Sequence, residues 1–178
     1  MIRQLSSRRV YESPFLRLRE DAIEQPDGTR GIYGVVEKPD FALVVPWDGA
    51  QLHLVGQYRY PVSSFEWEFP QGGVEGFAPE QPEAIAAREL EEEAGLRAGR
   101  LEHLGRLWHA YGFSQQGFDA YLATDLAAGE TRREPTEQTM ETRTVGVDEL
   151  ECMILSGELR DAPSVAAWGL VRMRGLIP

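Results

Sequence analysis

A glycine loop followed by a glutamate-rich helix is the feature that most constrains the fold of this chain. Residues 65–69 alternate apolar and polar side chains, which predicts a strand, and this strand ends at Pro70-Gln71-Gly72-Gly73. Residues 81–94 then contain no glycine and many strong helix formers, with Pro82 suited to the first turn and Gly95 to the C-terminal stop. We therefore expect a strand, a glycine loop and a helix of about thirteen residues in direct succession.

Three of the four glutamates in the middle of this helix share one side. At about 100° per residue, Glu89, Glu92 and Glu93 fall within an arc of about 100°. Glu91 points away from them, toward solvent. A run of glutamates is most often the solvated face of a surface helix, but the strand and glycine loop before it favour a metal site. Glycines allow close backbone approach to a ligand, and a divalent cation relieves the repulsion between the carboxylates.

The same residues resemble the signature of the Nudix hydrolase family, which runs Gly, five residues, Glu, seven residues, Arg-Glu-apolar-x-Glu-Glu-x-Gly-apolar. The second half matches in full, from Glu80 to the segment Arg88-Glu89-Leu90-Glu91-Glu92-Glu93-Ala94-Gly95-Leu96. The first half is longer here, because seven residues separate Gly72 from Glu80, or six if Gly73 is the motif glycine. We interpret Phe77-Ala78-Pro79 as an insertion at the junction of loop and helix.

The resemblance implies a fold, a cofactor and roles for the motif residues. The expected fold is α+β, an α/β/α sandwich around a mixed β-sheet in which the signature forms a loop-helix-loop. The implied metal ligands are Glu89, Glu92, Glu93 and the backbone carbonyl of Gln71. The structural positions of the motif are Gly72, Gly73, Arg88 and Gly95. Arg88, four residues before Glu92, would orient the glutamates, and ligation by oxygen alone favours Mg²⁺, with Mn²⁺ as the alternative.

Other stretches resemble the ADP-ribose pyrophosphatase branch of this family, whose members hydrolyse nucleoside diphosphate sugars. These stretches are Val55-Gly56-Gln57-Tyr58-Arg59-Tyr60-Pro61, Trp67-Glu68-Phe69-Pro70 and Ser156-Gly157-Glu158-Leu159-Arg160-Asp161-Ala162. Arg59 is then a candidate contact for the diphosphate of the substrate, the alternative being an exposed strand arginine. Glu68 is a candidate carboxylate of the substrate site, in either a structural or a metal-shell role.

The branch usually takes its general base from an acidic downstream loop, which corresponds here to residues 134–141. We expect Glu137 to be the base, with Glu141 as second candidate and Glu93 as the catalytic carboxylate of the helix. The alternative is that the loop carboxylates have no role.

One departure concerns the substrate, because the branch often carries Ser-Pro-Gly and then Glu where this chain has residues 110–116. Gln115 and Gln116 cannot supply that charge, so ADP-ribose is only the leading expectation among nucleoside diphosphate sugars.

The remaining patterns predict an N-terminal subdomain, a hydrolase domain and the strands and helices within them. Residues 15–20 and 32–36 read as a small antiparallel hairpin, which assigns 1–38 to an N-terminal hairpin subdomain and 39–178 to the hydrolase domain. In the resembling branch such strands often cross to a partner subunit, which predicts a homodimer. A second hairpin is expected from residues 41–46 and 51–59. Further strands are expected at 101–108, 118–123 and 142–147, and helices at 147–156 and 164–173.

Composition limits the partners of the chain. A net charge of −11 opposes binding to nucleic acid polymers, although small anionic substrates remain accessible with a metal. No run approaches the ~20 apolar residues of a membrane span, and the N-terminal segment lacks an apolar signal core, so we expect a cytoplasmic protein. Cys152 is the only cysteine, which excludes an internal disulfide.

Several rival functions share the family resemblance. One is a dinucleoside polyphosphate hydrolase or an enzyme acting on RNA 5′ ends, to which Phe69-Pro70-Gln71-Gly72-Gly73 has some likeness. Another is a non-catalytic module that binds a nucleotide sugar, although such a module need not keep a destabilising acidic cluster. A third is isopentenyl diphosphate isomerase, which needs an active-site cysteine, whereas Cys152 lies far downstream in an expected helix.

Overall fold

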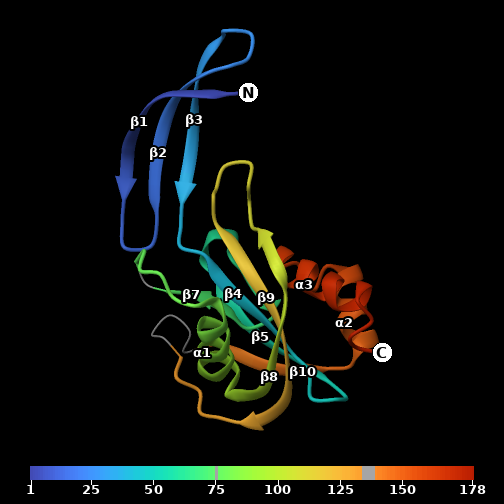
Figure 1. The fold of residues 1–178 in the computed structure, drawn as a ribbon. Coiled ribbons are helices and arrows are strands. Elements are labelled where there is room, and N and C mark those ends of the chain that lie inside the picture. The colour runs from blue at the N-terminus through green and yellow to red at the C-terminus, as the bar shows by residue number, and fades with distance from the viewer. Residues whose placement is uncertain (75, 134–138) are drawn as a thin grey trace.

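Residues 1–74, 76–133 and 139–178 are described by the computed structural model, and they form an α+β fold (Figure 1). In chain order the elements are β1 (Arg3–Glu12), β2 (Arg17–Glu24), β3 (Arg30–Glu37), β4 (Phe41–Pro46), β5 (Leu52–Arg59), η1 (Tyr60–Val62), β6 (Ser64–Glu68), β7 (Gln71–Gly73), α1 (Pro82–Ala94), β8 (Leu96–Trp108), β9 (Gly117–Ala128), β10 (Glu141–Val145), α2 (Val147–Ser156) and α3 (Ala162–Met173). The three expected helices are confirmed. Gly95 ends α1 in the left-handed region, with φ 66°.

The N-terminal segment is a three-stranded antiparallel sheet in the order β1-β2-β3, which stands apart from the other strands in Figure 1. The expected hairpin was incomplete, because β1 adds a third strand. Every residue of β1 is exposed, so its sequence lacks the apolar alternation that marks a half-buried strand. Its pairing with β2 is supported at the surface by Arg3–Glu24 and Arg8–Glu20 ion pairs of 2.8 and 2.9 Å.

The other strands form two sheets, ordered β7-β4-β9-β8 and β10-β5-β6. The prediction of a hairpin between β4 and β5 was wrong, because these neighbours in sequence lie in different sheets. An isolated bridge between Trp47 and Leu52 closes the turn that connects them. Both strands are almost fully buried, so each needs neighbours on both edges. β4 has β7 and β9, in antiparallel and parallel pairing, while β5 has β6 and β10.

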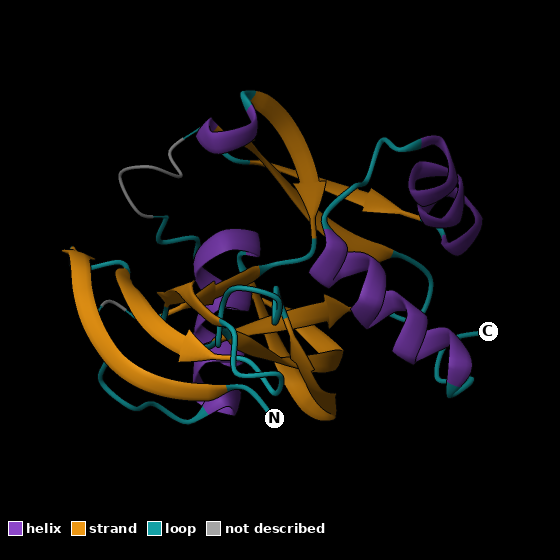
Figure 2. Cartoon of the chain, turned by 90° about the horizontal axis from the view of Figure 1, so that it is seen from above, coloured by secondary structure: helices purple, strands orange, loops and turns teal. Residues whose placement is uncertain are grey.

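Helices cover both faces of the four-stranded sheet (Figures 1 and 2). Along β4, Ala42 and Val44 belong to the cluster that includes Leu90 of α1. The alternate residues Leu43 and Val45 belong to a second cluster, with Ala167, Trp168 and Val171 of α3. This arrangement confirms the α/β/α sandwich around a mixed sheet. No helix in the described ranges is long and apolar enough to span a membrane.

Candidate active site

The glutamates of α1 lie against the glycine loop. Glu89 and Glu93 are only 8% and 1% exposed. Glu93 accepts a hydrogen bond of 2.9 Å from the backbone N–H of Gln71. A Cβ added to Gly72 would lie 2.4 Å from Oε2 of Glu89, so only glycine allows this approach. Glu92 is about one-third exposed. The loop therefore packs directly on two of the three glutamates that are predicted metal ligands.

Glu91 takes a different direction from the other three. Its Oε1 accepts two hydrogen bonds from Arg97 of β8, at 2.8 and 2.6 Å, and its side chain is 27% exposed. The expectation that Glu91 simply faces solvent was therefore incomplete. Glu91 therefore pairs with the sheet, whereas Glu89 and Glu93 contact the glycine loop.

Arg88 connects α1 to the loop and to the inserted junction. One terminal nitrogen donates to both carboxylate oxygens of Glu80, at 2.8 and 2.9 Å, and the other donates to the carbonyl of Gly73 at 2.8 Å and to Glu89 at 3.2 Å. Glu92, the partner expected from helix spacing, is more distant at 3.6 Å. The longer junction before Glu80 thus preserves an ion pair between Glu80 and Arg88.

The side of α1 that carries Glu89, Glu92 and Glu93 has the kind of oxygen donors that bind a divalent cation. The side chains supply carboxylate oxygens, which hard cations such as Mg²⁺ prefer, and the missing side chain at Gly72 makes room for the Glu89 carboxylate against the loop. No group of three or more His, Cys, Asp or Glu side chains among the described residues is already gathered at metal-binding distances. Gln71 presents its backbone N–H, not its carbonyl, to Glu93. Ligation would therefore require the carboxylates to turn toward a shared ion.

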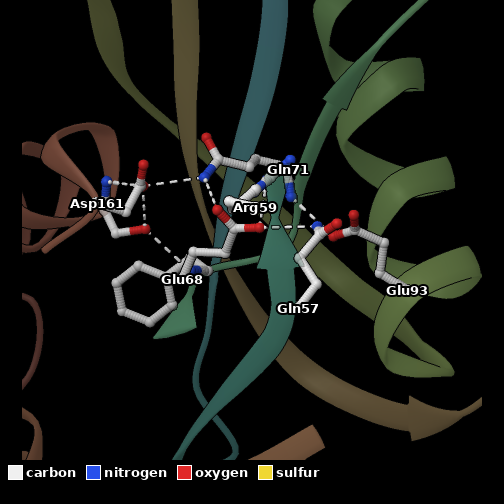
Figure 3. A network of polar contacts seen from close by, with 8 residues as sticks. Gln57, Arg59, Glu68, Gln71, Glu93 and Asp161 are labelled. Carbon is white, nitrogen blue, oxygen red and sulfur yellow. Dashed lines mark hydrogen bonds and ion pairs between the residues drawn. The ribbon is translucent and has the colours of Figure 1, made fainter. Parts of the chain in front are cut away.

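A buried polar network around Glu68 adjoins the loop (Figure 3). The Glu68 side chain is 3% exposed and accepts hydrogen bonds from Arg59, from Gln57 at 2.9 Å and from the Gln71 side chain at 3.1 Å. Burial raises the pKa of Glu68, Arg59 opposes the shift, and nearby Asp161 adds to it. Arg59 is therefore not a solitary strand arginine, because Glu68 holds its guanidinium in place.

The network continues into the start of α3, which the sequence reasoning missed. Gln71 Nε2 also donates to Asp161 Oδ2 at 2.9 Å (Figure 3). Asp161 caps α3 by accepting from the N–H and the hydroxyl of Ser164, at 2.9 and 2.7 Å. The same hydroxyl accepts from the N–H of Phe69 at 2.9 Å. The run Asp161-Ala162-Pro163-Ser164 is a helix-start pattern that could have identified the cap, but not its contact with the loop.

A cavity of about 880 Å³ opens beside this network. The glycine loop, β6 and the start of α3 line one part of it, and Arg59, Arg160 and Lys38 bring positive charge to its wall. Gln116 also lines the cavity, and its side-chain amide donates a hydrogen bond of 2.7 Å to the carbonyl of Pro39. The cavity therefore joins cationic side chains to the loop that supports the glutamates.

Two family models match the chain. The model of the nucleoside diphosphate sugar hydrolase N-terminal domain matches residues 2–36, and the NUDIX domain model matches residues 38–168. The chain belongs to the Nudix family. Hydrolases of this family generally use divalent metal ions, which agrees with the oxygen-rich face of α1.

Two relatives and one solved structure show how far the likeness extends. An ADP-ribose pyrophosphatase of Mycobacterium tuberculosis is 32% identical over 91% of this chain and 79% of its own length. A CMP-5'-(N-acetyl-N-hydroxy-3-aminopropyl)phosphonate hydrolase of Streptomyces rubellomurinus is 34% identical over 94% of this chain and 79% of its own. A crystal structure of an ADP compounds hydrolase has a TM-score of 0.84 at 23% identity, covering 97% of this chain and 92% of the other, and shows that the fold is shared.

The two predicted base residues, Glu137 and Glu141, belong to the segment that leads into β10. Glu137 lies outside the described residues. Glu141 is the exposed first residue of β10 and pairs with Gly56 of β5. Since successive side chains alternate between the faces of a sheet, Glu141 projects from the face opposite that of Gln57 and Glu68. The described structure therefore does not bring Glu141 to the Glu68 network. Cys152, the cysteine relevant to the isomerase alternative, is exposed on α2.

We expect Ser164→Ala to lower the free energy of unfolding by about 1–3 kcal/mol, as measured by urea denaturation. Ser164 is fully buried, and its hydroxyl is the acceptor for the Phe69 N–H. Alanine would leave that donor buried without a partner. Ser156→Ala, at the exposed end of α2, is the control and should change stability by less than about 0.5 kcal/mol. Equal stability of the two variants would contradict a structural link between β6 and α3.

Proposed function

We propose that this protein is a Mg²⁺-dependent hydrolase of the diphosphate bond in a nucleoside diphosphate linked to another group, with ADP-ribose as the first candidate. The single observation that carries the proposal is the packing of Glu89 and Glu93 against Gly72 and Gln71, beside a cavity that Arg59 lines. The names of the Mycobacterium and Bacillus subtilis relatives, both ADP-ribose pyrophosphatases, support this substrate class.

The side chains divide the work of the proposed reaction. Arg59 would bind the diphosphate through its guanidinium nitrogens, because the buried carboxylate of Glu68 holds the guanidinium group in place. The Gln71 N–H and Gly72 would keep Glu93 and Glu89 directed along one side of the helix. A divalent cation bound on that side would neutralise the charge of the phosphate oxygens and lower the pKa of water. Glu137 is the proposed general base, and removal of a proton by such a group typically accelerates a reaction about 10²–10⁴-fold.

A hydrolysis screen tests this function. The protein is incubated with Mg²⁺ and ADP-ribose, other nucleoside diphosphate sugars, dinucleoside polyphosphates or nucleoside triphosphates, and the products are identified by mass. We expect AMP and ribose 5-phosphate from ADP-ribose. Turnover of dinucleoside polyphosphates alone would favour that rival function, and no turnover of any compound would favour a binding module.

A nucleotide linked to a phosphonate is a second candidate substrate. The Streptomyces relative, named for hydrolysis of a CMP-linked phosphonate, matches this chain at least as closely as the ADP-ribose pyrophosphatases. The mixed anhydride of CMP with a simple alkylphosphonate, joined by a P–O–P bond, therefore belongs in the same screen. Release of CMP at a higher kcat/KM than that of AMP from ADP-ribose would identify this class as the preferred one.

We also propose that the protein is a cytoplasmic homodimer joined through its N-terminal sheet. Each residue of β1 is exposed, and apolar side chains such as Leu5, Val10 and Ile32 lie uncovered on this sheet. Light scattering after gel filtration should give twice the mass of one chain. Leu5→Glu together with Val10→Glu should shift the mass toward a monomer, whereas a wild-type monomer at micromolar concentration would contradict the proposal.

A further inference from the structure

A second buried carboxylate in the cavity wall also holds an arginine. Glu66, with its side chain 11% exposed, accepts hydrogen bonds from Nε of Arg160 at 3.2 Å and from one of its terminal nitrogens. Ser64 donates a further bond to Glu66 at 2.5 Å. The bond from Ser64, followed by that from Arg160, lowers the pKa of Glu66, which is therefore a charged partner. Arg160 is thus anchored to β6 although it lies in the segment between α2 and α3.

This pair repeats the arrangement of Arg59 and Glu68. Glu66 and Glu68 are two residues apart on β6, so they project from the same face at a spacing of about 7 Å. Both carboxylates and both arginines line the same cavity. Glu68 also contacts Gln71 of the glycine loop. Glu66 and its partner Arg160 therefore lie farther from that loop, by two residues along β6.

The arginines are turned outward from their carboxylates. The Arg160 and Arg59 side chains are 59% and 39% exposed, against 11% and 3% for Glu66 and Glu68 beneath them. Arginine carries five N–H donors in a planar fork. The contacts of Arg160 with the described residues use Nε and one terminal nitrogen, which leaves the other terminal nitrogen for a ligand. Two guanidinium groups, each anchored to one of two carboxylates about 7 Å apart along β6, suit a ligand with two adjacent phosphoryl groups.

We infer that Arg160 is a substrate-binding residue that contacts the second phosphoryl group of the diphosphate, while Arg59 contacts the one nearer the glycine loop. This inference rests on the proposed function and extends it, because it makes the paired phosphoryl groups the element that the cavity recognises. Glu66 is a positioning residue in this scheme. Its carboxylate keeps the guanidinium of Arg160 at the cavity wall.

Binding of two nucleotides that differ by one phosphoryl group tests the inference without relying on turnover. The probes are AMP and α,β-methylene-ADP, whose P–C–P bridge is not hydrolysed, and calorimetry with Mg²⁺ present gives both dissociation constants. Wild-type protein should bind α,β-methylene-ADP more tightly than AMP. Arg160→Gln combined with Glu66→Gln, which removes the ion pair without changing net charge, should weaken α,β-methylene-ADP binding about tenfold or more and AMP binding less than about twofold.

Matched variants separate binding from a structural effect. Arg160→Lys keeps the charge but loses the fork, so it should retain part of the preference for α,β-methylene-ADP. Arg174→Gln, an exposed arginine beyond α3 and outside the cavity, should bind both probes like wild type. Equal weakening of both probes, or no change in the double variant, would overturn the role of Arg160 while leaving the proposed hydrolysis intact. Wild-type protein that binds α,β-methylene-ADP no more tightly than AMP would also overturn the role of Arg160. If neither probe binds and no compound in the screen is hydrolysed, the proposed function itself is overturned.

Discussion

Glu93→Gln should reduce turnover of ADP-ribose by more than about a hundredfold while the protein stays folded, and Glu92→Gln should do the same. Outer-shell residues of metal sites already change affinity or activity about 10–100-fold, and loss of a ligating charge should exceed that. Glutamine has nearly the shape of glutamate, and its carbonyl oxygen can still accept the Gln71 N–H that now binds Glu93. The lost property is the negative charge.

The measurement compares kcat at saturating Mg²⁺ with the thermal unfolding midpoint of each variant. Glu91→Gln is the matched control, because Glu91 lies on the same helix but pairs with Arg97. Its turnover should remain within about threefold of wild type, since Arg97 and Glu91 form a partly exposed pair. Near-wild-type turnover in both the Glu92 and the Glu93 variants would contradict the assignment of metal ligands.

Gly72→Ala should reduce turnover about a hundredfold or more through one added methyl group. The new Cβ would lie 2.4 Å from Oε2 and 2.6 Å from Cδ of Glu89, closer than van der Waals contact allows. Glu89 is almost buried and is also held by Arg88, so its carboxylate must leave its place beside the loop or push the loop away. A displacement of about 1 Å at a reacting centre can reduce a rate about a hundredfold.

Gly34→Ala provides the control for Gly72→Ala. A Cβ on Gly34, in β3, would meet no atom within 4 Å and would need no unusual backbone conformation. Its turnover should equal that of wild type. Activity assays at several Mg²⁺ concentrations should show that Gly72→Ala also raises the Mg²⁺ concentration needed for half-maximal rate. An active Gly72→Ala enzyme with unchanged metal dependence would contradict the close contact between loop and helix.

Local patterns predicted the elements of the site well. The extent of α1 follows from helix formers bounded by Pro82 and Gly95, and the grouping of Glu89 with Glu93 follows from helix geometry alone. Long-range pairing could not be predicted in this way. The pair of Arg88 with its helical neighbour Glu92 forms at 3.6 Å as helix spacing predicts, but the closer partner is Glu80, because the loop before the helix folds back on it.

Elements with weak sequence signals account for the other differences. β1 has no buried face, so no apolar alternation reveals it. β4 and most of β5 are buried on both faces, so alternation cannot tell which strands they pair with. Asp161 and Ser164 act on the glycine loop from far along the chain, and their contact with Gln71 and Phe69 depends on how α3 packs. Such contacts follow from the tertiary arrangement rather than from local sequence.

The most direct test of the central claim is hydrolysis of ADP-ribose before and after removal of divalent cations. The claim is that the carboxylates of α1 and the adjoining cavity together cleave a diphosphate with the help of a metal. We expect AMP and ribose 5-phosphate to form in equal amounts with Mg²⁺, to stop forming when EDTA is added, and to form again when excess Mg²⁺ is restored. Undiminished hydrolysis in EDTA, or no release of either product at any Mg²⁺ or Mn²⁺ concentration, would contradict it.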